Sequence, residues 1–194
     1  MKLKKINKPI IFFIFIFICL FFLPAYVTAD SKKAILDDIT ITSTRDKLFV
    51  YFTVKNCFKD DMIQAIHNGI TATFEFTIEI REFRPFALDE LVKKIIFTHS
   101  VKYDTVRKVY DVVLTEKSNE VKTVTDFETV KYLMSKVEAV EVADMEIFDK
   151  DLKYKLNMMA KLDKVELPMY LHYILFFVSL WDFKTDWYSF DIPK

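Results

Sequence analysis

Apolar and polar residues alternate along much of this chain, most regularly between residues 70 and 81. In that row every even position from Ile70 to Ile80 is apolar, and every odd position is Thr, Glu or Arg. A period of two is typical of a β-strand with one buried and one exposed face. Similar or weaker rows predict further strands at 34–42, 48–54, 95–103, 110–114, 139–148, 152–162 and 187–192.

Two segments have the helical period instead. One apolar stripe consists of Phe127, Val130, Leu133, Met134 and Val137. Just before it, Thr125 and Glu128 have the spacing of a capping box, in which Thr125 accepts a hydrogen bond from the Glu128 amide. A shorter helix is predicted over 60–68, with Met62, Ile63 and Ile66 facing inward and Gly69 ending it as a left-handed cap.

Strands that are exposed on one face favour antiparallel sheets over a parallel α/β sheet. We therefore predict a mainly β (α+β) fold, an antiparallel β-sandwich-like domain of about seven to nine strands with one or two short helices. In the segment 139–148 the apolar phase shifts between Val142 and Met145, which predicts a bulge or a bend.

The first 29 residues have the three parts of a secretory signal peptide. The basic leader contains Lys2, Lys4, Lys5 and Lys8. An uncharged apolar run follows at 10–23, then Pro24, and then the small-residue cleavage site Val27-Thr28-Ala29. We expect this N-terminal signal helix to be removed after Ala29, leaving residues 30–194 as a single exported β-rich domain of the periplasm or cell envelope.

An uncleaved membrane anchor is the alternative. A spanning helix needs about 20 apolar residues, and the run 9–27 is nearly that long. Pro24 and the Val-x-Ala site favour cleavage. Cys19 lacks the preceding small residues of a lipoprotein cleavage site. Membrane association through the N-terminal helix is thus the second expectation for localisation.

Composition excludes several classes of site. Gly69 is the sole glycine, so the chain cannot build a phosphate-binding loop, a nucleophile elbow or a dinucleotide-binding turn. Four of the 28 basic residues lie in the leader, which leaves 24 against 28 acidic residues, a formal charge of −4 with no electrostatic reason to bind nucleic acid. Outside the leader Cys57 is the only cysteine, and we expect it to be buried.

No histidine has the spacing of a catalytic or metal motif. The three histidines are His67, His99 and His172. His67 comes just before a helix end, where a histidine is favoured. His99 lies in an apolar strand row, which favours a rim or hydrogen-bonded core role, and His172 lies in an apolar run. We therefore expect no catalytic residue, metal or cofactor.

Two groups of acidic residues are candidate sites. An acidic stretch that joins two predicted strands contains Asp144, Glu146, Asp149 and Asp151, and it lacks the spacing and glycine of a calcium loop. A solvated hairpin tip is the favoured interpretation. Asp182 and Asp186 flank a short segment between two tryptophans, where a turn is favoured over a carboxylate pair for acid–base chemistry.

The C-terminal run 169–180 is almost wholly apolar but too short to span a bilayer. The favoured interpretation is a buried element that closes the core. The alternative is an apolar ligand or docking surface formed by aromatic residues in and after the run. Its candidate residues are Tyr170, Tyr173, Phe176, Phe177, Trp181 and Trp187.

Short motifs along the chain resemble those of a known family in their order. The motifs are Ala65-Ile66, Asn68-Gly69-Ile70, the Phe74/Phe76 strand, Arg84, Tyr110, Leu114-Thr115, the Phe127 helix, Leu162-Asp163, Leu167-Pro168, Trp181-Asp182-Phe183 and Trp187-Tyr188. The chain resembles the exported bacterial family called domain of unknown function four-three-nine-zero, over nearly all of 30–194. The resemblance implies an exported bacterial protein and no reaction, so no catalytic residue is assigned from it.

The expected function is therefore a non-catalytic exported interaction or accessory module of the cell envelope. Its partner would be an unknown envelope protein or a membrane surface. A binder of a lipid or another apolar ligand is the alternative, and it requires an apolar pocket. A hydrolase with an unrecognised site is the third hypothesis, and it requires His or Asp side chains that converge in one cleft.

Overall fold

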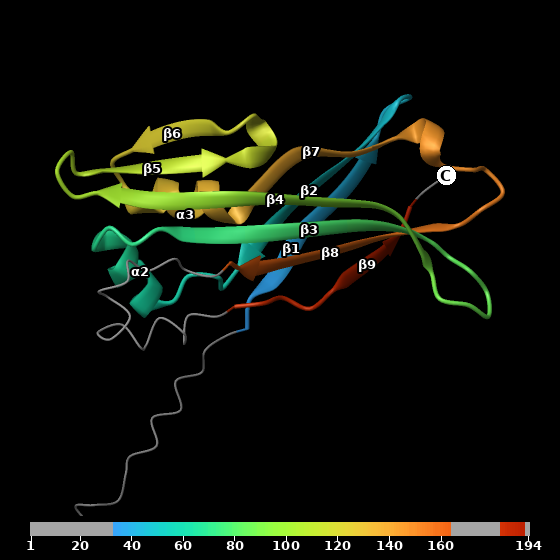
Figure 1. Ribbon diagram of the computed structural model, residues 1–194, viewed down its shortest axis with the longest axis horizontal. Coiled ribbons are helices and arrows are strands. Elements are labelled where there is room, and N and C mark those ends of the chain that lie inside the picture. Colours follow the sequence, from blue (N-terminus) through green and yellow to red (C-terminus); the bar gives the residue numbers. More distant parts are fainter. Residues whose placement is uncertain (1–32, 164–182, 193–194) are drawn as a thin grey trace, which may run out of the picture. The chain divides into compact units, whose positions relative to one another are not determined.

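Residues 33–163 and 183–192 are described in this computed structural model, and they form two antiparallel sheets with two α-helices (Figure 1). The smaller sheet has the order β1-β2-β7, with β1 (Ile35–Ser43), β2 (Lys47–Lys55) and β7 (Lys136–Asp144). The larger has the order β6-β5-β4-β3-β8-β9, with β3 (Ala72–Glu82), β4 (Glu90–Asp104), β5 (Val109–Leu114), β6 (Glu120–Val124), β8 (Tyr154–Leu162) and β9 (Tyr188–Asp191). The predicted mainly β, sandwich-like fold is confirmed.

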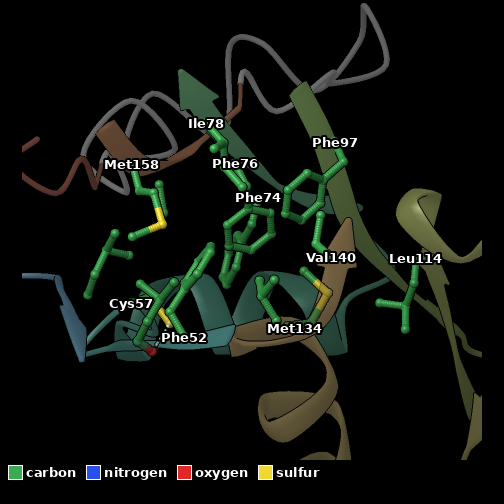
Figure 2. Packing of buried hydrophobic residues seen from close by; sticks show 14 of the residues in the cluster. Phe52, Cys57, Phe74, Phe76, Ile78, Phe97, Leu114, Met134, Val140 and Met158 are labelled. Atoms are coloured by element: carbon green, nitrogen blue, oxygen red, sulfur yellow. Dashed lines mark hydrogen bonds between the residues drawn. The ribbon is translucent and has the colours of Figure 1, made fainter. Parts of the chain in front are cut away.

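Aromatic side chains join the inner faces of the two sheets. The Phe76 ring of β3 lies with its centroid 5.8 Å from that of Phe52 on β2 and stacks at 5.0 Å on Phe97 of β4. Figure 2 shows these rings with Met134 from the helix beside them. Each fully buried side chain of this size contributes about 1.5–3 kcal/mol of transfer free energy. The even-numbered residues of the 70–81 row form the core side of β3, as their alternation predicts.

The first helix, α2 (Asp60–His67), ends as the sequence predicts. Gly69 has a φ of +84°, a conformation that favours glycine over any residue with a Cβ. Its N–H donates to the Ile66 carbonyl oxygen at 2.9 Å, and the Ile70 N–H reaches back to Ala65 at 3.0 Å. These two bonds satisfy carbonyl groups of the last helical turn.

The second helix, α3 (Phe127–Ser135), corrects two details of the prediction. Its cap is Asp126, whose side chain accepts from the Thr129 N–H at 2.7 Å, so the capping box starting at Thr125 is wrong. Asp is a stronger N-cap than Thr, and the helix therefore begins one residue later. The helix ends at Ser135, and Val137 is buried as part of β7 rather than on the helical stripe.

Strand ends account for most other differences. Strand β6 is absent from the predicted strands, because its residues show no clear alternation of apolar and polar positions. Its Val121 is 59% exposed. The strand predicted at 139–148 is β7, which starts earlier, at Lys136, and ends at Asp144. The 3₁₀ turn η2 (Met145–Ile147) follows it. The pairing of β7 with β2 skips Val142, which confirms the bulge predicted there. Leu152 precedes β8 and is 38% exposed.

Residues 1–29 and the apolar run 169–180 lie outside the described residues. Within 33–163 and 183–192, no helix combines the length and the apolar character that a membrane span requires.

Candidate functional site

The aromatic docking surface proposed from the sequence falls mostly outside the described residues. That is the case for Tyr170, Tyr173, Phe176, Phe177 and Trp181. Trp187 is described, lies just before β9 and is 47% exposed. The surface as a whole therefore stays a prediction. The described candidate sites lie on the two sheets.

Strand β4 is paired along one edge for most of its length and along the other edge only near its end. It pairs with β3 from Glu90 to Val101, whereas β5 pairs with it only from His99 to Asp104. Figure 1 shows β5 and β6 alongside one half of β4, while the other half continues past their ends. Thr115 closes the pairing, because its hydroxyl group accepts from the Thr98 N–H at 2.7 Å and donates to the Thr98 carbonyl oxygen at 3.1 Å.

After Thr115 the chain turns away from β4 into the 3₁₀ turn η1 (Thr115–Lys117). This turn leaves a cleft of about 740 Å³ between β4, η1 and β7, which we call the β4–β7 cleft. Ile96 and Phe97 line it from β4, Glu116 from η1, and Glu138 and Glu141 from β7. The cleft thus lies where the two sheets separate.

The β7 wall of the cleft is irregular. The pairing of β7 with β2 jumps from Val140 opposite Val50 to Val137 opposite Phe52. At the bulge between them, Ala139 has a φ of +53°. Bulges bend a strand and interrupt its hydrogen-bond ladder. Strand β7 is therefore bent where it lines the cleft, and nothing in its alternation predicted this second bulge.

A buried histidine lies directly behind the cleft. His99 of β4 is 0% exposed, and its ring packs on Phe76 with centroids 4.6 Å apart. Its Nδ1 lies 3.1 Å from the Met134 carbonyl oxygen near the end of α3. Its Nε2 lies 3.1 Å from Oε1 of Glu116, without the alignment of a hydrogen bond, and the Glu116 side chain is 8% exposed.

The contact with Met134 determines which ring nitrogen of His99 carries a proton. A carbonyl oxygen only accepts, so Nδ1 of His99 carries a proton and donates to Met134. Its Nε2 faces the buried carboxyl group of Glu116 at 3.1 Å. The two polar groups therefore meet inside the protein, where their interaction is weakly screened by water.

Glu116 is held as a carboxylate. Burial is the largest single influence and raises the pKa of its carboxyl group, but His99, a backbone hydrogen bond and Lys117 together lower the pKa by more, so the net pKa lies below the ordinary value of 4.5. Glu116 lines the cleft, and its second oxygen, Oε2, is buried and has no hydrogen-bond partner within the described part of the chain. Buried carboxylate oxygens normally accept hydrogen bonds, so this atom marks the cleft as a candidate binding site.

The sequence placed His99 correctly in a hydrogen-bonded core position but did not find Glu116. A buried histidine in an apolar row requires polar partners, so the sequence indicated that such a partner exists but not which residue it is. The partner comes from a turn after another strand, and only the pairing of β4 with β5 brings it close. No spacing in the chain encodes that contact.

The other titratable candidates do not join this site. His67 is exposed at the end of α2, where its ring lies 4.9 Å from that of Phe127. His172 and Asp182 lie outside the described residues, and Asp186 is exposed and pairs with Lys33 at 2.7 Å. The acidic stretch is exposed at all four of its predicted positions, Asp144, Glu146, Asp149 and Asp151. The residues that the structure describes contain no group of three or more side chains placed to hold a metal ion.

Cys57 is 2% exposed, which confirms its predicted burial. Its Sγ donates to the Val54 carbonyl oxygen at 3.4 Å. Burial raises the pKa of the thiol to about 12. The thiol is therefore protonated at neutral pH and packs as a small apolar group rather than acting as a nucleophile.

A second and more apolar hollow lies at the end of the domain that includes η2. We call it the end groove; its volume is about 1000 Å³. Phe83, Phe148, Leu152 and Ile192 supply apolar surface, and Tyr154 packs edge-on against Phe148 with centroids 5.1 Å apart. The Tyr154 hydroxyl oxygen accepts from the Asp149 N–H at 3.2 Å, which ties the loop before β8 to the groove.

One comparison with known proteins identifies the family of this chain. A model of the family described as "Domain of unknown function (DUF4390)" matches residues 31–191. The chain belongs to this family. The resemblance noted in the motifs is thereby confirmed, and the family description names no activity. Comparisons with curated proteins and with solved structures found no match.

Proposed function

We propose that this domain is a non-catalytic binding module of the cell envelope, which takes up a partner in the β4–β7 cleft. The observation that supports this proposal is the buried, unpartnered Oε2 of Glu116, a residue that lines the cleft. Leaving a buried acceptor unsatisfied costs about 1–3 kcal/mol. A partner that donates a hydrogen bond to this oxygen would recover that free energy on binding.

The chemistry of the pair favours binding over catalysis. A general base works best with a pKa near the operating pH, and the lowered pKa of Glu116 makes it a weak base at neutral pH. Both ring nitrogens of His99 face protein atoms, Met134 and Glu116. The hydroxyl group of Thr115, which also lines the cleft, is engaged by the Thr98 backbone. These contacts leave the His99–Glu116 pair without an activated nucleophile and do not favour the hydrolase hypothesis.

Photo-cross-linking tests the cleft as a binding site. We would introduce p-benzoylphenylalanine at Ile96 or Glu141 of the cleft, and at the exposed Glu128 of α3 as the matched control. Cells that express the full chain would be irradiated and fractionated. We expect a discrete adduct from the two cleft positions and a lower yield when Glu116→Gln is added. Equal adducts from all three positions, or none from the cleft, would contradict the proposal.

Export is the second part of the proposal, and the three-part leader at 1–29 supports it. The test is the intact mass and N-terminal residue of the native protein in soluble and membrane fractions. A soluble envelope protein that begins at Asp30 is the expected result. A membrane-bound chain that keeps Met1 would show instead that the leader is an anchor.

A binder of an apolar ligand remains the second candidate, because the end groove offers an apolar surface. A fluorescent fatty acid is a suitable probe. If this function is correct, the probe binds the purified protein, Leu152→Glu abolishes binding and Glu116→Gln leaves it unchanged. Binding that is indifferent to Leu152→Glu would exclude the end groove as its site.

A further inference from the structure

We propose that the occupant of the β4–β7 cleft is an extended, basic segment of a partner polypeptide, which adds as a strand to the free half of β4. This inference rests on the binding function proposed above and specifies the chemistry of the ligand. It draws on the backbone of β4, the bent course of β7 and the charges of the cleft.

The backbone of β4 offers unpaired hydrogen-bonding groups to the cleft. The N–H and C=O groups of alternate residues in a strand point to the same edge. Thr98 directs both groups toward Thr115, on the β5 side. Ile96 and Lys94 therefore direct theirs to the same edge, where no strand of the described residues pairs with them. An unpaired edge is a template for another extended chain, and strand addition is a common mode of peptide recognition.

The neighbouring strand does not fill this position. Strand β7 lies across the cleft, but its register shifts twice, at Val142 and between Val137 and Val140. Bulges bend β7 away from a straight course, and β4 and β7 are not paired in either sheet. The two strands thus remain apart, with the cleft of about 740 Å³ between them. An incoming strand would continue along the line of β5, beyond the point where η1 turns away.

The charges of the cleft favour a basic side chain on the incoming strand. Three carboxylates line the cleft, those of Glu116, Glu138 and Glu141, against a single lining cation, Lys117. Glu138 and Glu141 already have lysine partners, with N–O distances of 2.8 Å to Lys136 and 2.6 Å to Lys47. Oε2 of Glu116 has none among the described residues. A lysine or arginine would form a charge-assisted hydrogen bond there, about twice as strong as a neutral one.

Selection from a random peptide display library tests the occupant directly. Peptides of about ten residues cover the usual range of strand lengths. The library would be selected on the purified exported protein, and the most enriched peptide would be titrated by fluorescence anisotropy. Three variants would be compared: Glu116→Gln removes the charge, Ile96→Pro removes the edge donor, and Ile96→Thr keeps the donor as the matched control.

We expect enriched peptides with alternating β-branched residues and a lysine or arginine. Glu116→Gln and Ile96→Pro should each weaken binding by about tenfold or more, as the loss of a charge-assisted or ladder hydrogen bond predicts. Ile96→Thr should bind within about twofold of the unmodified protein, because its backbone donor is intact. The peptide should also slow hydrogen exchange at the Ile96 amide.

Other outcomes overturn the inference. It is wrong if no peptide is enriched, or if binding is indifferent to both Glu116→Gln and Ile96→Pro. Self-association of the protein that these two variants abolish would identify a second copy as the occupant instead. If the cleft positions form cross-links but no peptide is selected, the binding function stands and strand addition is rejected. If the cleft forms no cross-links and no peptide is selected, both proposals are rejected.

Discussion

The two halves of β4 have the same neighbour on one side and different neighbours on the other. From His99 to Val101 the strand has β3 on one edge and β5 on the other, and β5 continues the pairing to Asp104. From Glu90 to Phe97 it has β3 alone, and the end of this segment, at Ile95–Phe97, lines the cleft. The paired half carries fully buried residues such as Val101, whereas Ile96 in the free half is 54% exposed. One strand thus supplies both core and candidate site.

The buried contact between His99 and Glu116 lies at the boundary between the two halves of β4. Thr98 is bonded to a side chain rather than to a backbone partner, and the next residue, His99, is the buried histidine that contacts Glu116. The turn that ends β5 therefore leaves the adjacent edge of β4 unpaired, and it places the carboxylate of Glu116 beside that edge.

The largest expected effect comes from breaking the pair at this boundary. His99→Phe would leave the Glu116 carboxylate buried without the polar ring nitrogen that lies 3.1 Å from it. Removing one partner of a buried ion pair costs about 3–5 kcal/mol, so we expect the free energy of unfolding to fall by about 4 kcal/mol. Urea denaturation measures this change.

The control for that prediction replaces both partners. His99→Phe combined with Glu116→Met removes the charge as well as the histidine, and buried pairs exchanged for apolar groups are often neutral in stability. The double variant should recover most of the loss. If it is as unstable as His99→Phe alone, the loss comes from ring packing and not from the orphaned carboxylate.

The next largest effect separates the two halves through their backbone. Ser100 lies on the same edge of β4 as Thr98 and Ile96, but it is opposite Val113 of β5 and its N–H belongs to the ladder. Ser100→Pro removes that donor and strains the strand, at an expected cost of about 3 kcal/mol. Ser100→Thr, which keeps the donor, is the control and should unfold close to the unmodified protein in urea.

A smaller effect tests the charge on Glu116. Glu116→Gln keeps the shape but loses the ionic contact with His99, and hydrogen bonds to charged groups contribute about 1.5–3 kcal/mol, so we expect a loss of about 2 kcal/mol at neutral pH. The pKa of Glu116 is lower in the folded protein than its ordinary value of 4.5. Its contribution is therefore complete above pH 4.5 and is lost as the pH falls through the lower folded value.

The measurement is the difference in unfolding free energy between the unmodified protein and Glu116→Gln over a series of pH values. The other carboxylates are common to both proteins and cancel. The difference should be constant from neutral pH down to about 4.5 and should shrink in more acidic solution. A difference that grows on acidification would contradict the lowered pKa.

The sequence predicted the sheets better than it predicted the site, for a physical reason. Alternation reports which face of a strand is buried, and it located the core side of β3 through Phe74, Phe76 and Ile78. It does not report which edge is paired, because edges are formed by backbone groups that every residue carries. The free half of β4 and its contact with Glu116 depend on where β5 ends, and Thr115 ends it without a glycine or proline signal.

The smallest expected effect is on the free edge itself. Ile96→Pro changes the same strand and the same edge as Ser100→Pro, four residues away, but the N–H it removes has no ladder partner among the described residues. Proline is tolerated on sheet edges whose N–H groups are unpaired. We therefore expect a loss below about 1 kcal/mol in urea denaturation, with Ile96→Thr within about 0.5 kcal/mol of the unmodified protein. If Ile96→Pro is as damaging as Ser100→Pro, the edge of β4 is already paired in solution, and the cleft is not open to a partner strand.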